Sequence, residues 1–205
     1  RSLFNFYGKV LTDKELWEIV QSSEKIAHGN PSGIDTVTTS GKSPVFFVKD
    51  QPIEQLSINM DAYLIVADTG QTGQTLKAIQ SVKALLSKVT YQIDSLSDPK
   101  QAIKELGQLT KLAKEALLNN YILELGEVMN QAHQLLASLT VSNQTLDRLA
   151  QAARQAGALG AKLTGGGRGG CLIALAKDKE SAEKIARTLL EQGAKQAWCQ
   201  YLGNL

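Results

Sequence analysis

The chain has 205 residues, of which 43% are hydrophobic and 20% charged, and its formal net charge at pH 7 is +2. This length suits one large domain or two small ones, with enough apolar residues for a buried core. The near-neutral charge, with Lys and Arg dispersed among acids, argues against a nucleic-acid partner. No apolar run approaches the ~20 residues that a membrane helix needs, and no signal peptide is visible.

The first fifty residues are expected to contain two helices followed by short strands. Residues 1–7 have the pattern of the last turns of a helix. Thr12 to Glu15 has the form of a capping box, in which a hydroxyl and a carboxylate satisfy N–H groups at the start of a second helix. Apolar residues then recur at helical spacing. Residues 36–40 and 44–48 are β-like runs around a turn.

The stretch from Glu24 to Asp35 ends the second helix in a tight turn. Pro31 stops the helix, because its ring disfavours helical geometry at the preceding residue. Ser32 and the following glycine can then deliver Asp35 beside the helix end. A carboxylate placed there can orient a hydroxyl, accept its proton or hold a metal, although an ordinary helix stop with a capping Asp explains the same spacing. Glu24 and His28 could bind zinc, but no further ligands accompany them.

A polar segment with one proline, residues 49–55, divides the chain into predicted domains 1–55 and 56–205. In the second domain, apolar residues alternate in strands and recur every three or four residues in helices. The predicted strands are 62–67, 161–164, 171–176 and 197–202, and the predicted helices are 76–88, two between 99 and 139, 145–156 and 179–192. We expect His133 on a solvated helix flank. We expect Cys171 and Cys199 to be buried, reduced thiols of a cytoplasmic protein.

Two loops of the second domain carry candidate binding groups. The hydroxyls of Thr72 and Thr75 could line a substrate pocket, whereas Thr72 could equally be a helix N-cap. Residues 165–170 read Gly-Gly-Gly-Arg-Gly-Gly. They formally contain G-x-G-x-x-G, but a strand follows where a dinucleotide site needs a helix, and the Lys of a P-loop is missing. This glycine loop either lets another surface approach its backbone closely or is only a wide hairpin turn.

Two segments resemble the motifs of one kinase family. Residues 28–35 read HGNPSGID and closely resemble the HGNPSG-[IV]-D segment of mevalonate kinases, within the larger family of galactokinase, homoserine kinase, mevalonate kinase and phosphomevalonate kinase. Residues 162–171 resemble that family's K-L-T-G-A-G-G-G-G-C motif, with Arg168 in place of a glycine. By this resemblance Asp35 is the catalytic aspartate and Glu24 is a magnesium ligand.

The resemblance implies ATP-dependent phosphorylation of the primary hydroxyl of (R)-mevalonate in isoprenoid biosynthesis, with Mg²⁺ as cofactor and ATP as co-substrate. Arg168 could place a cation near the nucleotide phosphates or point to solvent. The implied loop over the reacting groups is Gly165, Gly166, Gly167, Arg168 and Gly169, and a substrate pocket could include His28, Ser32, Thr72 and Thr75. Of these, His28 suits a structural role better than a ligand role.

The implied fold is α+β, with a four-stranded antiparallel, ferredoxin-like sheet covered by helices. The family's phosphate-binding motif P-x-x-x-G-L-G-S-S-A is not in this chain, so we expect a C-terminal part of a kinase that is inactive alone. Residues 1–55 would then be the tail of an α+β N-terminal domain, with apolar surface exposed over 9–50. Alternatives are a phosphomevalonate or homoserine kinase, or a non-catalytic ligand-sensing or interaction module. Small-molecule partners are expected, and a homodimer stays open.

Overall fold

The computed structural model describes residues 2–28, 33–41, 43–49, 51–88 and 98–203. The chain divides into two compact units, residues 1–58 and residues 59–204. That division falls just after the polar segment 49–55, although two independent domains remain a prediction. Within the described ranges, no helix combines the length and the apolar character that crossing a bilayer requires.

The first unit contains three helices and a small hairpin. Its elements are α1 (Ser2–Phe6), α2 (Asp13–His28), α3 (Ile34–Ser40), β1 (Val45–Phe46) and β2 (Glu54–Gln55). The two strands pair antiparallel. The predicted capping box is confirmed, since the Thr12 N–H donates to Glu15 Oε2 at 2.9 Å and the Glu15 N–H donates to Thr12 Oγ1 at 3.3 Å. The Thr12 hydroxyl also donates to Glu15 Oε2, at 2.6 Å, and the two bonds that Thr12 donates to the Glu15 carboxyl lower its pKa.

The strand predicted at residues 36–40 is wrong, because this segment is helix α3. Its β-branched threonines favour a strand when propensity alone is considered. Gly33, with φ 95°, turns the chain into the helix. The Thr38 hydroxyl donates to the Ile34 carbonyl at 2.9 Å, which satisfies this polar group inside a helix.

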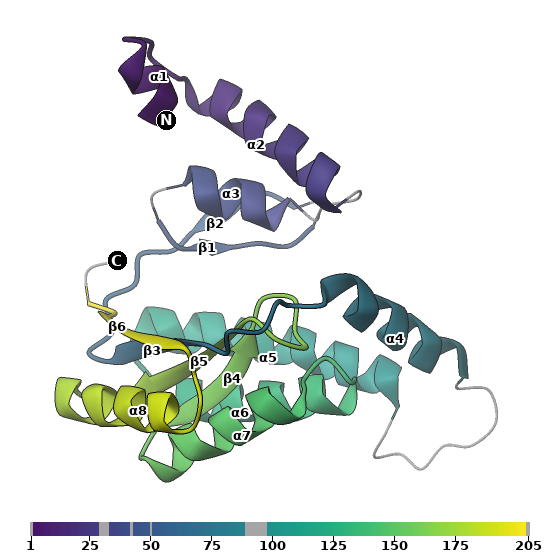
Figure 1. Cartoon of the computed structure of the whole chain (residues 1–205), viewed down its shortest axis with the longest axis vertical. Coiled ribbons are helices and arrows are strands. Elements are labelled where there is room, and N and C mark those ends of the chain that lie inside the picture. The colour runs from purple at the N-terminus through teal and green to yellow at the C-terminus, as the bar shows by residue number, and fades with distance from the viewer. Residues whose placement is uncertain (1, 29–32, 42, 50, 89–97, 204–205) are drawn as a thin grey trace. The chain divides into compact units, whose positions relative to one another are not determined.

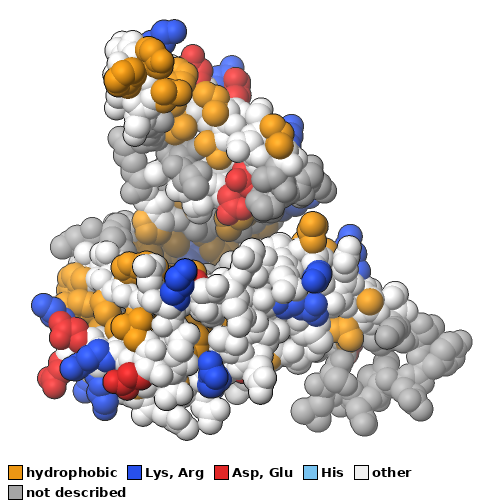
Figure 2. Space-filling model, in the orientation of Figure 1, with side chains coloured by type: hydrophobic (Ala, Val, Ile, Leu, Met, Phe, Trp, Pro, Cys, Tyr) orange, Lys and Arg blue, Asp and Glu red, His pale blue; other side chains and the backbone are white. Residues whose placement is uncertain are grey.

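Helices α1 and α2 expose many large apolar side chains. Figure 2 shows these side chains, in orange, gathered over both helices. Those exposed on α1, α2 and the link between them are Leu3, Phe6, Tyr7, Val10, Trp17, Ile19 and Ile26. The first unit therefore exposes apolar surface within residues 9–50, as the sequence predicts.

The second unit is a four-stranded antiparallel sheet with helices packed against it (Figure 1). Its elements are β3 (Tyr63–Asp68), α4 (Thr75–Lys88), α5 (Pro99–Asn119), α6 (Ile122–Ser138), α7 (Gln144–Gln155), β4 (Gly160–Thr164), β5 (Cys171–Ala176), α8 (Lys179–Glu191) and β6 (Gln196–Tyr201). The strand order β4-β5-β3-β6 is the ferredoxin-like arrangement. The predicted α+β fold is confirmed.

The core lies where α7 and α8 cover one face of this sheet. Residues that pair across antiparallel strands point to the same face. Ile65 pairs with Ala174, which pairs with Ala161, and all three are fully buried. The helices fill the space above these three residues with Leu146, Leu149, Ile185 and Leu189.

The outer edge of β4 is covered by helix α6. Glycines let the two backbones approach, because a Cβ at Gly126 would lie 2.6 Å from the Leu159 carbonyl oxygen and one at Gly160 would overlap Gly126. Asn130, one helical turn after Gly126, donates from Nδ2 to the Leu159 carbonyl at 3.1 Å and accepts the Ala161 N–H at 3.0 Å. The Asn130 amide therefore pairs with backbone groups at this edge that a neighbouring strand would otherwise pair with.

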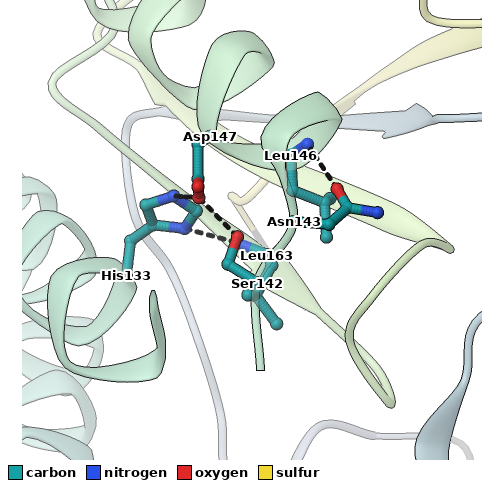
Figure 3. Close-up of polar contacts among 6 residues, drawn as sticks. All are labelled: His133, Ser142, Asn143, Leu146, Asp147 and Leu163. Atoms are coloured by element: carbon teal, nitrogen blue, oxygen red, sulfur yellow. Dashed lines mark hydrogen bonds and ion pairs between the residues drawn. The ribbon is translucent and has the colours of Figure 1, made fainter. Parts of the chain in front are cut away.

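His133 continues this contact and is buried, with 5% of its surface exposed, so the predicted solvated position is wrong. Its Nδ1 accepts the Leu163 N–H at 3.2 Å, and its Nε2 lies 3.2 Å from Asp147 Oδ1 (Figure 3). The Ser142 hydroxyl donates to the same Asp147 oxygen at 2.5 Å. Both ring nitrogens thus face groups from other elements, which helical spacing alone does not indicate.

Burial lowers the pKa of His133, and the charges of Arg154 and Lys162 lower it further. Asp147 acts in the opposite direction and raises this pKa, but burial is the larger effect. Burial also lowers the pKa of the Lys162 amine, which donates to the Leu163 carbonyl at 2.7 Å. His133 is therefore held neutral, with its proton on Nε2, since Nδ1 accepts a hydrogen bond.

The cysteines lie in strands, as expected, but they are not fully buried. Cys171 is half-buried at the start of β5, and Cys199 is exposed on β6, a strand at the edge of the sheet. Both are free thiols, and burial of the sulfur raises the pKa of each.

We predict that the free energy of unfolding falls as the pH drops below about 6.5, the ordinary imidazole pKa. The pKa of His133 is lower in the folded chain, so the unfolded chain takes up the proton first and is favoured by acid. His133→Gln keeps an acceptor for Leu163 but cannot titrate, so its unfolding free energy should change less over this range. Urea unfolding at about pH 7.5 and about pH 5.5 measures the difference. If the unfolding free energy of His133→Gln depends on pH as strongly as that of the wild type, this assignment is wrong. His28→Gln, which removes the chain's other histidine, measures how much of the pH dependence comes from that residue.

Candidate active site

The two candidate carboxylates lie on helices that pack against each other. Thr36, which is fully buried on α3, donates its hydroxyl hydrogen to Gln21 Oε1 on α2 at 2.8 Å. Glu24 follows Gln21 by about one helical turn, and Asp35 directly precedes Thr36. Glu24 is half-buried and Asp35 is exposed. The structure therefore brings together the helices that carry both carboxylates, as expected from the turn between them.

Other residues of this motif are only partly described. His28 is the last residue of α2, its side chain lies outside the described part of the chain, and so does the whole of Ser32. Among the described residues, no group of three or more His, Cys, Asp and Glu side chains could hold a metal. The Glu24 carboxylate suits Mg²⁺, which needs only one or two protein carboxylates beside waters and phosphate oxygens. The donor type therefore fits magnesium better than zinc.

The glycine loop between β4 and β5 has an unusual backbone. Five of its six residues have positive φ angles, a region that favours glycine because other residues meet steric clashes there. These are Gly165 (81°), Gly167 (77°), Arg168 (55°), Gly169 (138°) and Gly170 (73°). Such a run cannot extend either strand, so the ladder stops at the pair Thr164 and Cys171.

The glycine loop is approached closely by neighbouring segments of its own unit. A Cβ at Gly166 would overlap the Thr75 side chain, and one at Gly167 would overlap the Val141 carbonyl. At Gly169 it would lie 2.8 Å from the Thr72 carbonyl oxygen. The glycines thus admit other backbone segments, and the loop is more than a wide hairpin turn.

Backbone hydrogen bonds join the glycine loop to residues 69–74. The Gly170 N–H donates to the Gln71 carbonyl at 2.7 Å, and the Gln74 N–H donates to the Gly167 carbonyl at 3.1 Å. The Thr69 hydroxyl donates to the Gly170 carbonyl at 2.7 Å. Both loops that carry candidate binding groups therefore form one surface.

The N–H groups of Gly166, Gly167 and Gly169 make no backbone–backbone hydrogen bond to another segment among the described residues. Gly167 and Gly169 are buried, whereas Gly166 is half-buried, so its N–H is the one best placed to reach an anion. Gly165 and Gly167 have positive φ on either side of Gly166, which does not, and backbone that alternates in hand in this way can form a concavity for an anion such as phosphate. Thr72 and Thr75 lie beside these glycines with exposed side chains. The interpretation of Thr72 as a helix N-cap is wrong, because α4 begins at Thr75.

Sequence reasoning missed two amides beside this surface. Asn143 donates from Nδ2 to Gln71 Oε1 at 3.1 Å, and Gln71 Nε2 donates to the Thr145 hydroxyl at 3.3 Å. Asn143 is also the N-cap of α7, where its Oδ1 accepts the Leu146 N–H at 2.9 Å (Figure 3). The asparagine just before a helical pattern is the one signal that could have identified it.

Arg168 does not simply point to solvent, which was one of its two predicted positions. Its side chain is half-buried and reaches neighbouring elements. Nε donates to the Thr140 carbonyl at 2.9 Å, and one terminal nitrogen donates to the Ser81 hydroxyl at 2.9 Å and to Thr140 Oγ1 at 3.2 Å. The guanidinium is therefore bound to the protein, because its planar fork matches the acceptors of two other elements.

Known proteins resemble this chain along most of its length. The family described as GHMP kinases C terminal matches residues 113–195. A mevalonate kinase of Thermococcus sibiricus is 34% identical over 180 residues, covering 85% of this chain and 52% of the relative. A mevalonate kinase of Aeropyrum pernix is 32% identical over 207 residues, covering 92% and 60%. The chain thus spans about half of the length of the first relative and three fifths of the second.

Solved structures of mevalonate kinases are also similar to this chain. The crystal structure of L. major mevalonate kinase in complex with R-mevalonate matches with a TM-score of 0.86 and 28% sequence identity. The match covers 100% of this chain and 62% of that one. A mevalonate kinase from methicillin-resistant Staphylococcus aureus matches with a TM-score of 0.69 and 32% identity, covering 98% and 62%.

We predict that Gly166→Ala lowers the free energy of unfolding by ~1–3 kcal/mol, because the added Cβ overlaps Thr75 and the loop must shift. Gly107→Ala is the matched control. Gly107 lies inside α5 with nothing within 4 Å of the added atom, so alanine there should raise stability by ~0.5–1 kcal/mol. Urea unfolding of both variants measures these effects. Equal stability of Gly166→Ala and the wild type would show that the loop repacks freely.

Proposed function

Because this chain belongs to the GHMP kinase family, we propose that its full-length protein transfers the γ-phosphoryl group of ATP to the primary hydroxyl of (R)-mevalonate. One observation carries the proposal: the segment HGNPSGID at residues 28–35 occurs in a chain whose curated relatives are named mevalonate kinase. The helices on either side of this segment pack together, which supports a shared role for Glu24 and Asp35.

In this proposal Asp35 is the general base. It accepts the proton of the substrate hydroxyl while the hydroxyl oxygen attacks the γ-phosphorus, and ADP leaves with the electron pair of the broken P–O bond. The exposed position of Asp35 at the start of α3 lets a substrate hydroxyl approach it. The hydrogen bond from Thr36 to Gln21 anchors this end of α3 to α2 and so limits the freedom of Asp35.

Glu24 would hold Mg²⁺, which neutralises charge on the transferring phosphates when it is bound. The half-buried position of Glu24 would orient its carboxylate more strictly than a fully exposed one. The N–H group of the half-buried Gly166 would donate to a phosphate or substrate oxygen, whose negative charge it would stabilise. Thr72 and Thr75 would add hydroxyl donors on the same surface.

A substrate screen separates this proposal from its alternatives. Full-length protein is assayed for ADP release with mevalonate, phosphomevalonate and homoserine as acceptors. Turnover with mevalonate well above the others is the expected result. Turnover with either of the other acceptors would reassign the substrate within the family. Absence of turnover with all three, from folded protein, would favour a non-catalytic ligand-sensing module.

We predict that Asp35→Asn lowers kcat by at least ~100-fold, the scale expected for loss of a general base. Nucleotide affinity should change only a few-fold, because Asp35 acts on the acceptor hydroxyl. Steady-state kinetics, with a separate titration of nucleotide binding, measures both. Full retention of kcat would remove Asp35 from the mechanism.

Glu24→Gln should raise the Mg²⁺ concentration needed for half-maximal rate, because the neutral amide is a weaker ligand for a hard cation. Glu18→Gln is the matched control, since Glu18 is an exposed carboxylate on the same helix. It should leave the Mg²⁺ titration unchanged. A Glu24→Gln enzyme that is stably folded and titrates like the wild type would assign Glu24 a structural role.

A further inference from the structure

Arg168 is held in an unfavourable backbone conformation by contacts with other elements. Its φ of 55° is left-handed, which costs a non-glycine residue about 1–2 kcal/mol. The Arg168 N–H donates to the Val141 carbonyl at 2.8 Å. Its guanidinium donates to the Thr140 carbonyl and hydroxyl in the turn between α6 and α7, and to Ser81 on α4. One side chain thus connects the glycine loop to two other elements.

Helix α4 is only partly held by apolar packing, so polar contacts can contribute to its position. Ala78 alone is buried among the described side chains of α4, and Val82, Leu85 and Leu86 are half-buried, whereas Leu76 and Ile79 are 69% and 47% exposed. Segments with few buried apolar contacts open at low free energy. The glycine loop meets α4 at Thr75, which lies against Gly166, and about two turns later at Ser81.

We propose that Arg168 is a positioning residue that couples the conformation of the glycine loop to the position of helix α4. Its guanidinium holds α4 and the turn at Thr140 against the loop, so that Thr75 and the N–H groups of the loop are presented together. For its effect on catalysis, this inference rests on the proposed kinase function. The coupling itself is a property of the second unit and can be tested without activity.

Limited trypsin digestion tests the coupling directly, because trypsin cuts after Arg168 only when the glycine loop leaves its contacts. Ser81→Ala removes one acceptor, and Arg168→Lys keeps the charge and the cleavage site but loses the planar fork. Both should be cut at this bond several-fold faster than the wild type. Ser87→Ala is the matched control on α4, since its hydroxyl bonds only the Ala84 carbonyl of its own helix. It should be cut at the wild-type rate.

Ser81→Ala and Arg168→Lys break one shared interaction in this proposal. The double variant should therefore be cut more slowly than the product of the two single accelerations predicts. Wild-type cutting rates in both single variants would overturn the coupling. So would equal acceleration in Ser87→Ala, because a general loosening of α4 would then explain the result.

Kinetics of the full-length enzyme tests the consequence for catalysis. Misplaced loop donors should lower kcat by ~10-fold or more in Ser81→Ala and Arg168→Lys, while KM for either substrate changes less than ~3-fold. A purely structural role would instead lower the melting temperature and leave kcat of the folded enzyme unchanged. Wild-type kcat in both variants, with faster cutting, would overturn the catalytic part of the inference. If the wild type shows no kinase activity, the proposed function fails while the digestion still decides the coupling.

Discussion

The open edge of strand β4 is the constraint on which much of the second unit depends. An edge strand presents unpaired N–H and C=O groups, and a buried donor left without a partner costs about 1–3 kcal/mol. Helix α6 removes this cost with two side chains, Asn130 and His133, that bind alternate N–H groups of the strand. The contact requires Gly126 and Gly160, since a Cβ on either would separate helix and strand. The glycines let helix α6 come close to β4, and only at that distance can Asn130 and His133 bond the N–H groups of the strand.

The same edge positions the candidate binding surface. Strand β4 ends at Thr164 and leads directly into the glycine loop, so a strand held on both sides fixes where the loop begins. The loop is then hydrogen-bonded to residues 69–74 and to the Val141 carbonyl. Hydrogen bonds to these neighbours therefore fix the loop backbone before any ligand binds, which lowers the reorganisation that binding would require.

Local pattern predicted most of the second unit. All four strands and the helices near 145–156 and 179–192 were expected from spacing, because their apolar faces meet one common core. The two failures have different causes. His133 was expected in solvent, but its partners come from β4 and α7, which the spacing within its own helix does not reveal. Residues 36–40 were expected as a strand from their β-branched side chains, but the turn at Gly33 just before them starts a helix. The family motif is the source of the roles proposed for Glu24 and Asp35, whereas the contact between Gln71 and Asn143 appears only in the folded chain.

The glycine loop also shows why one of its positions can be an arginine. At Gly166, Gly167 and Gly169 an added Cβ would overlap or crowd a neighbouring segment, so glycine is needed for space. At Gly169 the φ of 138° adds a second demand that only glycine meets readily. Arg168 lies at φ 55°, inside the left-handed region that other residues can enter at modest cost. Hydrogen bonds to ionised groups contribute about 1.5–3 kcal/mol, and the guanidinium makes three. A substitution that replaces glycine here can therefore stabilise the loop it interrupts.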